Sequence, residues 1–415
     1  MQLRVWSVVI AVSCVCNPAG AQTLFPGAGQ QAVLTEADAI ARLSADSPRV
    51  RAIRSGIDVA RADVLSASKW PNPRLYVGRE AVAGVSETIT TVLQPLPITG
   101  QRRFEIQAAD ALVDATTFRS DDAMRWARAD LRLAYADLVA AQTRERELTA
   151  ARDRLQDLAG ILTKREREGD AAGFDRLRAE REVLDVEADR VIAAADRARA
   201  QGRLVGFFAA NVDPATLVAA DAIVAVRDVP PIDALVDQAE RTRGELRALR
   251  SEMDSARFAR RAADRRRVPE PEVIGGTKTS TFGGGDVGGV LSVQAVLPLF
   301  DNGRAERARA QARESQASAR LEALRISVRG DIAAWRGAAL ERRAAADRYR
   351  AAAVASAADV ERIARVSYEA GERGILELLD AYRTSASARV RQAALDVSAR
   401  EAEIELEFVS GWEMP

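Results

Sequence analysis

The sequence contains no histidine among its 415 residues, and its two cysteines, Cys14 and Cys16, both lie at the N-terminus. The absence of histidine excludes histidine general bases, serine–histidine and cysteine–histidine nucleophile pairs, and histidine metal ligands. Because the N-terminal segment is expected to be removed, the mature chain would have neither disulfides nor thiol chemistry. We therefore expect neither histidine-based nor thiol-based catalysis, and no cofactor or resident metal site.

Lysine and long apolar runs are also scarce. Only three lysines occur, yet Lys and Arg together number 60 and balance 60 Asp and Glu, for a formal net charge of zero. The arginines are interleaved with acids, so no basic face emerges and nucleic acid is not an expected partner. Beyond the N-terminus no apolar run approaches the roughly 18 residues of a transmembrane helix. An exported chain of this kind would be either soluble or a β-barrel.

Residues 1–21 have the pattern of an export signal. Arg4 provides the positive start, residues 5–15 are apolar, and Ala19-Gly20-Ala21 is a small-residue cleavage site before Gln22. Lipid attachment at Cys14 is the alternative, but the residues before this cysteine lack the usual large aliphatic side chain. We expect a mature N-terminus at Gln22 without lipid.

The chain contains the same unit twice. Five landmarks recur in the same order, at a nearly constant separation of about 200 residues, far longer than a solenoid repeat. The pairs are residues 51–61 with 247–257, Pro71-x-Pro73 with Pro269-x-Pro271, Pro95-Leu96 with Pro298-Leu299, Ala134-Tyr135 with Ala334-Trp335, and Gly169-Asp170 with Gly371-Glu372. This duplication predicts a first repeat over residues 22–210, a linker over 211–231 and a second repeat over 232–415.

Most of each repeat is predicted to be helix. Residues 101–168, 304–369 and 375–408 are rich in Ala, Leu, Arg and Glu and contain no proline. Leucines recur every seven residues, as at Leu148, Leu155 and Leu162, which is typical of helices packed side by side. A helix of about 65 residues is about 100 Å long at 1.5 Å per residue, which no ordinary globular domain needs.

Four short windows in the Pro- and Gly-bounded segments are predicted to be strands: residues 74–82, 86–93, 272–282 and 289–297. Leu291 and Val293 alternate with Ser292 and Gln294, and in the second window Ile89 and Leu93 belong to such an alternation. Apolar-out, polar-in alternation over about 10 residues is typical of strands in a membrane barrel. The fold class is therefore mainly α with a small β part, in which each repeat is helix, hairpin, long helix, turn and helix.

Three motifs connect this element order to a known family: Trp70-Pro71-Asn72-Pro73, Leu93-Gln94-Pro95-Leu96 with Gly100-Gln101-Arg102-Arg103, and residues 297–304, Leu-Pro-Leu-Phe-Asp-Asn-Gly-Arg. With them the whole mature chain resembles the TolC-like outer-membrane efflux proteins, and the motifs are most similar to the cobalt–zinc–cadmium efflux branch. The resemblance implies a homotrimer in outer-membrane lipid, whose twelve-stranded barrel continues into the periplasm as a helical barrel. It also implies two partners, a periplasmic adaptor and an inner-membrane RND-type pump.

The resemblance also implies roles for particular residues. Glu377 and Asp380 match the two acids, three residues apart, that line the closed entrance in the family; ordinary solvated helix acids are the alternative. The turns at Gly169, Asp170, Gly371 and Glu372 would dock the adaptor. Pro95, Gly100, Pro298 and Gly303 would form the strand–helix corners, where proline removes a ladder donor and glycine permits the turn.

The function that the resemblance implies is the exit duct of a tripartite efflux pump, conducting metal cations or small toxic compounds from the periplasm to the exterior. Two alternatives remain open. An exit duct of a type I protein secretion system would share the fold and differ in its partners. A periplasmic adaptor has one helical hairpin inserted in a β-rich body, whereas this chain has two duplicated hairpins.

Overall fold

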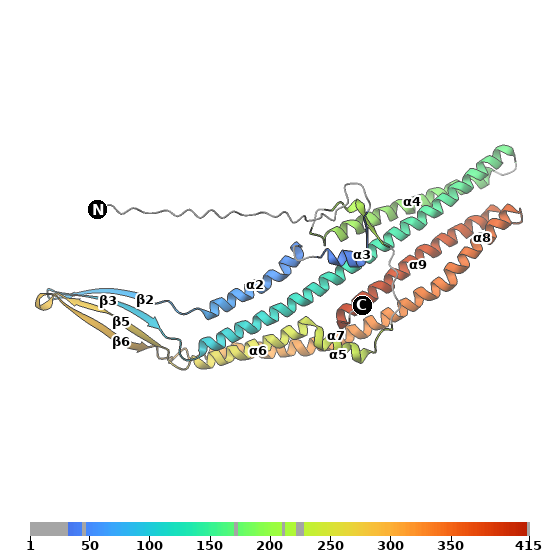
Figure 1. Cartoon of the computed structure of the whole chain (residues 1–415). Coiled ribbons are helices and arrows are strands. Elements are labelled where there is room, and N and C mark those ends of the chain that lie inside the picture. The colour runs from blue at the N-terminus through green and yellow to red at the C-terminus, as the bar shows by residue number, and fades with distance from the viewer. Residues whose placement is uncertain (1–31, 44–46, 170–172, 210–211, 221–227, 413–415) are drawn as a thin grey trace, which may run out of the picture.

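The computed structural model describes residues 32–43, 47–169, 173–209, 212–220 and 228–412. The expected signal peptide, with Cys14 and the cleavage site before Gln22, lies outside these residues. The described chain is elongated, with a four-stranded sheet at one end and helices along the rest of its length (Figure 1). Among the described helices, none has the length and apolar character needed to cross a bilayer.

The first repeat has the predicted order of helix, hairpin, long helix and helix. Its elements are β1 (Ala32–Leu34), α1 (Glu36–Ala41), α2 (Pro48–Ser68), β2 (Arg74–Val82), β3 (Val85–Pro95), α3 (Gln101–Glu168) and α4 (Gly173–Val205). Helix α3 continues for 68 residues between Gly100 and Gly169, whose φ angles are 81° and 84°. Because this left-handed conformation favours glycine, both ends of α3 are specified locally. The predicted helix 101–168 is confirmed.

The second repeat follows the same order with one interruption. Its elements and those leading to it are η1 (Pro214–Thr216), β4 (Leu217–Ala219), α5 (Ile232–Thr242), α6 (Gly244–Arg265), β5 (Pro271–Ser280), η2 (Phe282–Gly284), β6 (Asp286–Ala295), α7 (Arg304–Tyr349), η3 (Arg350–Val354), α8 (Ala355–Glu369) and α9 (Ile375–Ser410). The predicted helical run over 304–369 is confirmed, and it contains a π-helical turn, η3, that was not predicted. Beside it, Gln392 of α9 donates to the Ala346 carbonyl at 3.2 Å. A π-turn widens a helix by one residue locally, so the neighbouring helix can reach such a carbonyl.

The two hairpins form one antiparallel sheet in the order β2-β3-β5-β6. The predicted strands are therefore confirmed within a few residues, although β6 starts three residues early and ends at Ala295, before Pro298. Strands β2 and β6 are the two edges, and the described chain pairs neither edge with a further strand. A second, two-stranded parallel sheet joins β1 to β4. The sequence did not predict it, and β4 lies within the expected linker.

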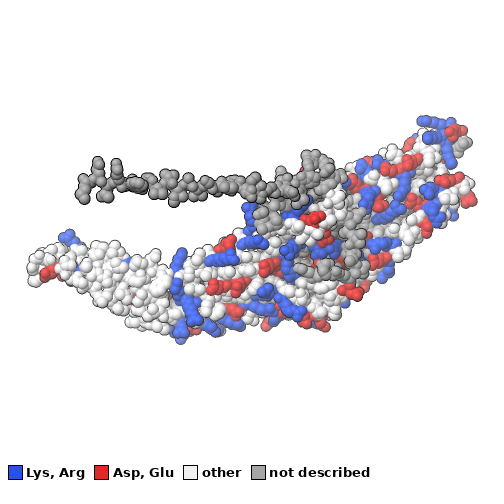
Figure 2. All heavy atoms as spheres, in the orientation of Figure 1, with Lys and Arg blue, Asp and Glu red and all other residues white. Residues whose placement is uncertain are grey.

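Strand register divides the large sheet into an apolar and a polar face. Leu75 pairs with Val92, and Gly275 pairs with both Val92 and Leu291, so these residues share one face. Ile89 pairs with Lys278 and therefore lies on the other, polar face. The alternation assigned to β3 consequently had the wrong phase, because threonines occupy both of its faces. Figure 2 shows that the sheet end carries few charges on the visible side, whereas the helices carry many of both signs.

The three largest apolar clusters among the described residues hold the helices together. One surrounds Leu131 and Leu138 of α3 in the first repeat, and a second surrounds Ile332 of α7 and Leu406 of α9 in the second. The third lies toward the hairpin tips and joins Leu158 of α3 to α9. Because that last cluster contains residues of both repeats, the two helical hairpins pack against each other rather than standing apart.

Candidate channel entrance and docking tips

The tips of the two helical hairpins lie at the end of the molecule opposite the sheet (Figure 1). Gly169 ends α3 and its amide donates to the Glu166 carbonyl at 3.1 Å; Asp170 lies outside the described residues. In the second tip Gly371 has a φ of 74°, and the Glu372 amide donates to the Ser367 carbonyl at 2.9 Å. Both glycines therefore terminate helices, and Glu372 is held in an exposed turn.

Glu377 and Asp380 lie at the start of α9, and both side chains are exposed. Their neighbours Ile375, Leu378 and Leu379 are buried in the cluster that joins the hairpins. Because successive helical residues are about 100° apart, the two acids project from the side of α9 opposite this buried face. Neither forms a direct ion pair with any described residue. The predicted shared face is confirmed, and the apolar contacts of α9 fix the direction in which it points.

Polar contacts hold α9 against the neighbouring helices at this level. Arg383 of α9 forms an ion pair with Glu182 of α4. Glu361 of α8 accepts a hydrogen bond from Ser385 of α9 at 2.5 Å and forms an ion pair with Arg154 of α3 at 3.5 Å. The segment that carries the two exposed acids is thus attached to both hairpins. Sequence reasoning did not find these contacts, because their partners are far apart in the chain.

The strand–helix corners are largely as predicted. Pro95 is the last residue of β3, and the Leu96 amide donates to the Pro271 carbonyl across the sheet at 2.9 Å. Pro298 does not end a strand, because β6 stops three residues before it. Gly303 has a φ of 74°, and a Cβ there would lie 2.2 Å from the Ala263 carbonyl oxygen of α6. At that corner glycine is required both by the backbone conformation and by the close approach of α6.

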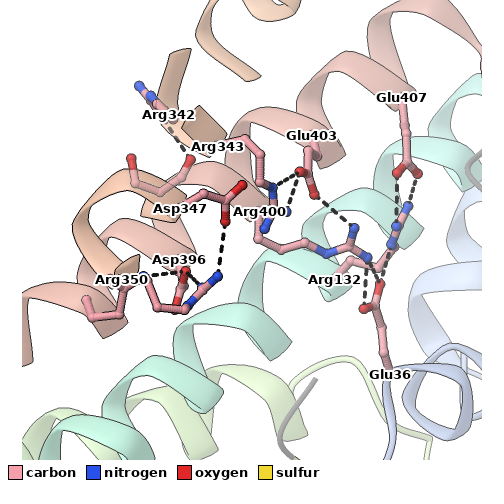
Figure 3. A network of polar contacts seen from close by, with 12 residues as sticks. Glu36, Arg132, Arg342, Arg343, Asp347, Arg350, Asp396, Arg400, Glu403 and Glu407 are labelled. Carbon is pink, nitrogen blue, oxygen red and sulfur yellow. Dashed lines mark hydrogen bonds and ion pairs between the residues drawn. The ribbon is translucent and has the colours of Figure 1, made fainter. Parts of the chain in front are cut away.

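A buried ion network halfway along the molecule was not predicted. Figure 3 shows Arg132 of α3 between Glu36 of α1 and Glu407 of α9. The Arg132 Nε donates to Glu36 at 2.5 Å, and Arg400 of α9 donates to both Glu36 oxygens at 3.0 Å. Glu403 continues the network toward α7. The side chain of Glu407 is only 5% exposed, so this charge is stabilised by its partners rather than by water.

The pKa values of the two glutamates of this network, Glu36 and Glu407, are shifted in opposite directions. Burial by itself would raise the pKa of Glu36, but the guanidinium groups of Arg400 and Arg132 lower the pKa below its usual value. At Glu407 burial prevails and raises the pKa, although Arg132 opposes it. Glu36 receives hydrogen bonds from both arginines, whereas Arg132 alone binds Glu407. Among the described residues no group of acids is arranged to hold a metal ion.

Comparison with known proteins shows what this chain is similar to. Residues 235–411, most of the second repeat, match the model of the outer membrane efflux protein family. Over 340 residues the chain is 24% identical to the cobalt-zinc-cadmium resistance protein CzcC of Cupriavidus metallidurans, covering 81% of this chain and 80% of the relative.

Solved structures share the fold over nearly the whole chain. A membrane protein from Pseudomonas aeruginosa superposes with a TM-score of 0.76 at 19% identity, covering 91% of this chain and 93% of the other. The outer membrane protein VceC from Vibrio cholerae gives a TM-score of 0.72 at 17% identity, covering 91% and 96%. The match to the family model over the second repeat, the curated relative over four-fifths of the chain and the shared fold thus make the chain similar to outer membrane efflux proteins over nearly its whole length.

Proposed function

We propose that the chain is the outer-membrane exit duct of a tripartite efflux pump, with most of its length in the periplasm. It conducts substrates passively from the periplasm to the exterior and performs no chemistry on them. The observation that carries the proposal is the efflux-family fold, which puts a sheet with membrane-length strands at one end and two exposed acids at the other. The name of the relative CzcC supports metal cations as cargo, with small toxic compounds as the broader class.

The proposed assembly is a homotrimer, which would close this sheet. The strands are 9 to 11 residues long, which matches the about 9–11 residues of a tilted membrane-spanning strand. Unpaired edges such as those of β2 and β6 are not tolerated in lipid. Pairing β6 of one subunit with β2 of the next removes every edge in a threefold ring of twelve strands. The helices of the three subunits then continue as a periplasmic barrel.

The acids at the start of α9 form the gate in this assembly. If Glu377 and Asp380 face the threefold axis, three subunits bring six carboxylates together in a narrow aqueous constriction. Rings of acids of this kind favour cations in channels. The turns at Gly169–Asp170 and Gly371–Glu372 dock a periplasmic adaptor, which connects the duct to an inner-membrane pump of the RND type. The exposure of Gly169, Gly371 and Glu372 at the end opposite the sheet supports this role.

Single-channel recording in planar bilayers tests the gate. We expect the double variant Glu377→Gln, Asp380→Asn to conduct more than the natural protein, to lose cation selectivity and to escape block by divalent cations. The matched control is Asp175→Asn, because Asp175 occupies the position in the first hairpin that corresponds to Glu377. The control should behave as the natural channel. Equal conductance, selectivity and block in all three proteins would contradict the gate. Absence of any channel activity in the natural trimer would contradict the proposed function itself.

A further inference from the structure

The four places where strands meet helices share a feature that the duct function does not explain. Each carries an exposed basic side chain that has no acidic partner among the described residues: Lys69 before β2, Arg103 after β3, Arg267 before β5 and Arg304 after β6. Arg265, also exposed before β5, lies over the Phe104 ring instead. Figure 2 shows basic atoms in a band across the molecule where the sheet end, which carries few charges, gives way to the helices. We call these four residues the junction bases.

The acids in the same segments are mostly engaged. Glu272 is paired with Arg74, Asp264 with Arg307 and Glu306 with Arg266, and Glu270 accepts a hydrogen bond from Thr99 at 2.8 Å. Asp301, which lies between β6 and α7, is exposed and forms no ion pair with a described residue. The junction therefore presents four free cations against one free anion, in a chain whose charges balance overall. This excess of exposed positive charge offers a place for an external anion.

The opposite end of the sheet has the reverse charge. Near the strand turns Lys278 is paired with Glu87 at 2.6 Å, and Arg79 donates to the Ser86 hydroxyl at 3.3 Å. Glu80 and Asp286 remain exposed there without an ion pair among the described residues. Two rims of one sheet, separated by about 10 residues of strand, thus carry opposite free charge. An anionic partner is therefore expected at the end of the sheet that adjoins the helices and not at the strand turns.

Apolar side chains next to the junction bases indicate where that anion lies. Trp70 is 57% exposed and Phe300 is 99% exposed, and both lie between a junction base and a strand. On the apolar face of the sheet Leu75 and Leu291 are 70% and 82% exposed. An apolar surface bounded by aromatic and then basic side chains matches the order of hydrocarbon, interface and headgroup in a bilayer.

We propose that the junction bases bind the phosphates of anionic phospholipids in the leaflet that faces the helical part of the molecule. Basic groups at the membrane surface attract anionic lipids, by about 1 kcal/mol for each Lys or Arg. Three copies of the chain would arrange the bases as a ring around the trimer and fix its depth in the membrane. This inference rests on the proposed outer-membrane function and adds the class of lipid that the protein recognises.

Lipid retention by the purified trimer tests the proposal. The protein is exchanged into mixed vesicles of phosphatidylglycerol and phosphatidylcholine, extracted in mild detergent and weighed by native mass spectrometry. We expect the natural trimer to retain phosphatidylglycerol in preference to phosphatidylcholine. The variant Lys69→Gln, Arg103→Gln, Arg267→Gln, Arg304→Gln should lose this preference, at about fivefold in affinity for each base removed.

The matched control neutralises four other exposed arginines without an ion pair among the described residues, farther along the helices: Arg51→Gln, Arg320→Gln, Arg348→Gln, Arg391→Gln. It should retain phosphatidylglycerol as the natural protein does. If the junction variant does not assemble, salt titration of the natural trimer decides, because exposed charge contacts weaken with ionic strength. Loss of the phosphatidylglycerol preference at high salt supports the proposal.

Two results would overturn the lipid assignment. In the first, the natural trimer shows no preference between the two lipids at low salt. In the second, the junction variant keeps its lipids but dissociates into monomers, which would assign the bases to contacts between subunits. Either result leaves the duct function intact as long as the natural trimer conducts in planar bilayers. A trimer that binds phosphatidylglycerol but never conducts would contradict the duct function alone.

Discussion

Equivalent positions of the two repeats hold α9 in different ways. Arg132 of α3 and Ile332 of α7 lie 200 residues apart, the same offset as Ala134-Tyr135 and Ala334-Trp335. Glu36, the first residue of α1, likewise corresponds to Ile232, the first residue of α5. In the first repeat this pair is an ion pair at 2.5 Å. In the second, Ile332 is fully buried and Ile232 packs against its cluster.

The C-terminal part of α9 lies between these two environments. Its Arg400, Glu403 and Glu407 take part in the ion network, whereas Leu406 and Val409 join the apolar cluster around Ile332. A helix with two different faces in contact with two different surfaces has one rotation that satisfies both. Apolar packing alone would give stability of a similar size, since buried ion pairs are often no better than apolar replacements. We therefore expect the ion network to fix one rotation of α9 rather than to add stability.

The largest expected effect comes from making the first repeat resemble the second at one position. Arg132→Ile leaves Glu407 buried without its cation, and we expect a loss of about 3–5 kcal/mol in the free energy of unfolding. Denaturant unfolding of the detergent-solubilised protein, followed by helical circular dichroism, measures this. Arg128→Ile is the control, because Arg128 is exposed on the same helix four residues earlier; its effect should stay within about 0.5 kcal/mol.

The combined variant Arg132→Ile, Glu36→Ile, Glu407→Leu removes the charges on both sides and approaches the apolar solution of the second repeat. We expect it to recover much of the lost stability, as apolar replacement of a whole buried ion group often does. Arg400 keeps Glu403 as a partner at 3.5 Å. If Arg132→Ile unfolds no more easily than Arg128→Ile, the ion network contributes nothing to stability. The difference between the two repeats would then have no effect on the free energy of unfolding.

A smaller effect, dependent on pH, distinguishes the two glutamates. The pKa of Glu36 is lowered, so its contribution to stability is complete above its ordinary value of 4.5 and is lost as the pH falls through the folded-state pKa. The pKa of Glu407 is raised, so the folded state gains stability as the pH falls through that pKa toward 4.5. The second repeat has no counterpart of the Glu36 titration, because Ile232 stands at that position.

Melting temperatures of Glu36→Gln and Glu407→Gln between pH 7 and pH 3 measure these terms against the natural protein. The stability that the natural protein has over Glu36→Gln should shrink on acidification below pH 4.5. Relative to Glu407→Gln, the natural protein should gain stability as the pH falls toward 4.5. Differences that run parallel for the two variants at every pH would mean that the glutamates titrate as one unit rather than in opposite directions.

Local signals explain what the sequence predicted correctly. Helix α3 was predicted to the residue because Gly100 and Gly169 flank a run without proline. The strand windows were found because proline and glycine bound them. The face of β3 that is apolar was predicted wrongly, because threonine occurs on both faces and hydrophobicity does not distinguish them. Nothing in Arg350–Val354 differs from ordinary helical sequence, so the π-turn depends on packing against α9.

The candidate entrance was predictable in part. The separation of three residues between Glu377 and Asp380 already placed both acids on one helix face, and the structure confirms that this face is exposed. The ion network was not predictable, because Arg132 and Glu407 are 275 residues apart in the chain. Alignment of the repeats offers a signal in hindsight: a charged residue stands where the second copy has isoleucine. Which way the entrance acids point in the trimer stays a prediction.

The tips are the region where the two repeats agree, and they should show the smallest effect on stability. Each has a glycine followed by an acid, and Glu372 is exposed in its turn. Glu372→Arg should therefore change the free energy of unfolding by less than about 0.5 kcal/mol and leave trimer yield unaltered. It should still weaken adaptor docking, because charge reversal at an interface replaces attraction by repulsion. Resistance of cells to exported compounds, with pull-down of the adaptor, measures this.

The control for the tip is Glu322→Arg, a charge reversal of an exposed acid on α7 far from the turn. It matches Glu372→Arg in charge and exposure, so any difference between the two variants reports the position rather than the charge. If both leave resistance and adaptor binding at the natural level, Glu372 has no role in docking. If both lower trimer yield, the change acts on folding. A loss of resistance in Glu372→Arg alone, at natural trimer yield, would show that Glu372 takes part in docking. The glycine–acid sequence that the two tips share would then be explained by docking, and the ion network that the repeats do not share by the attachment of α9.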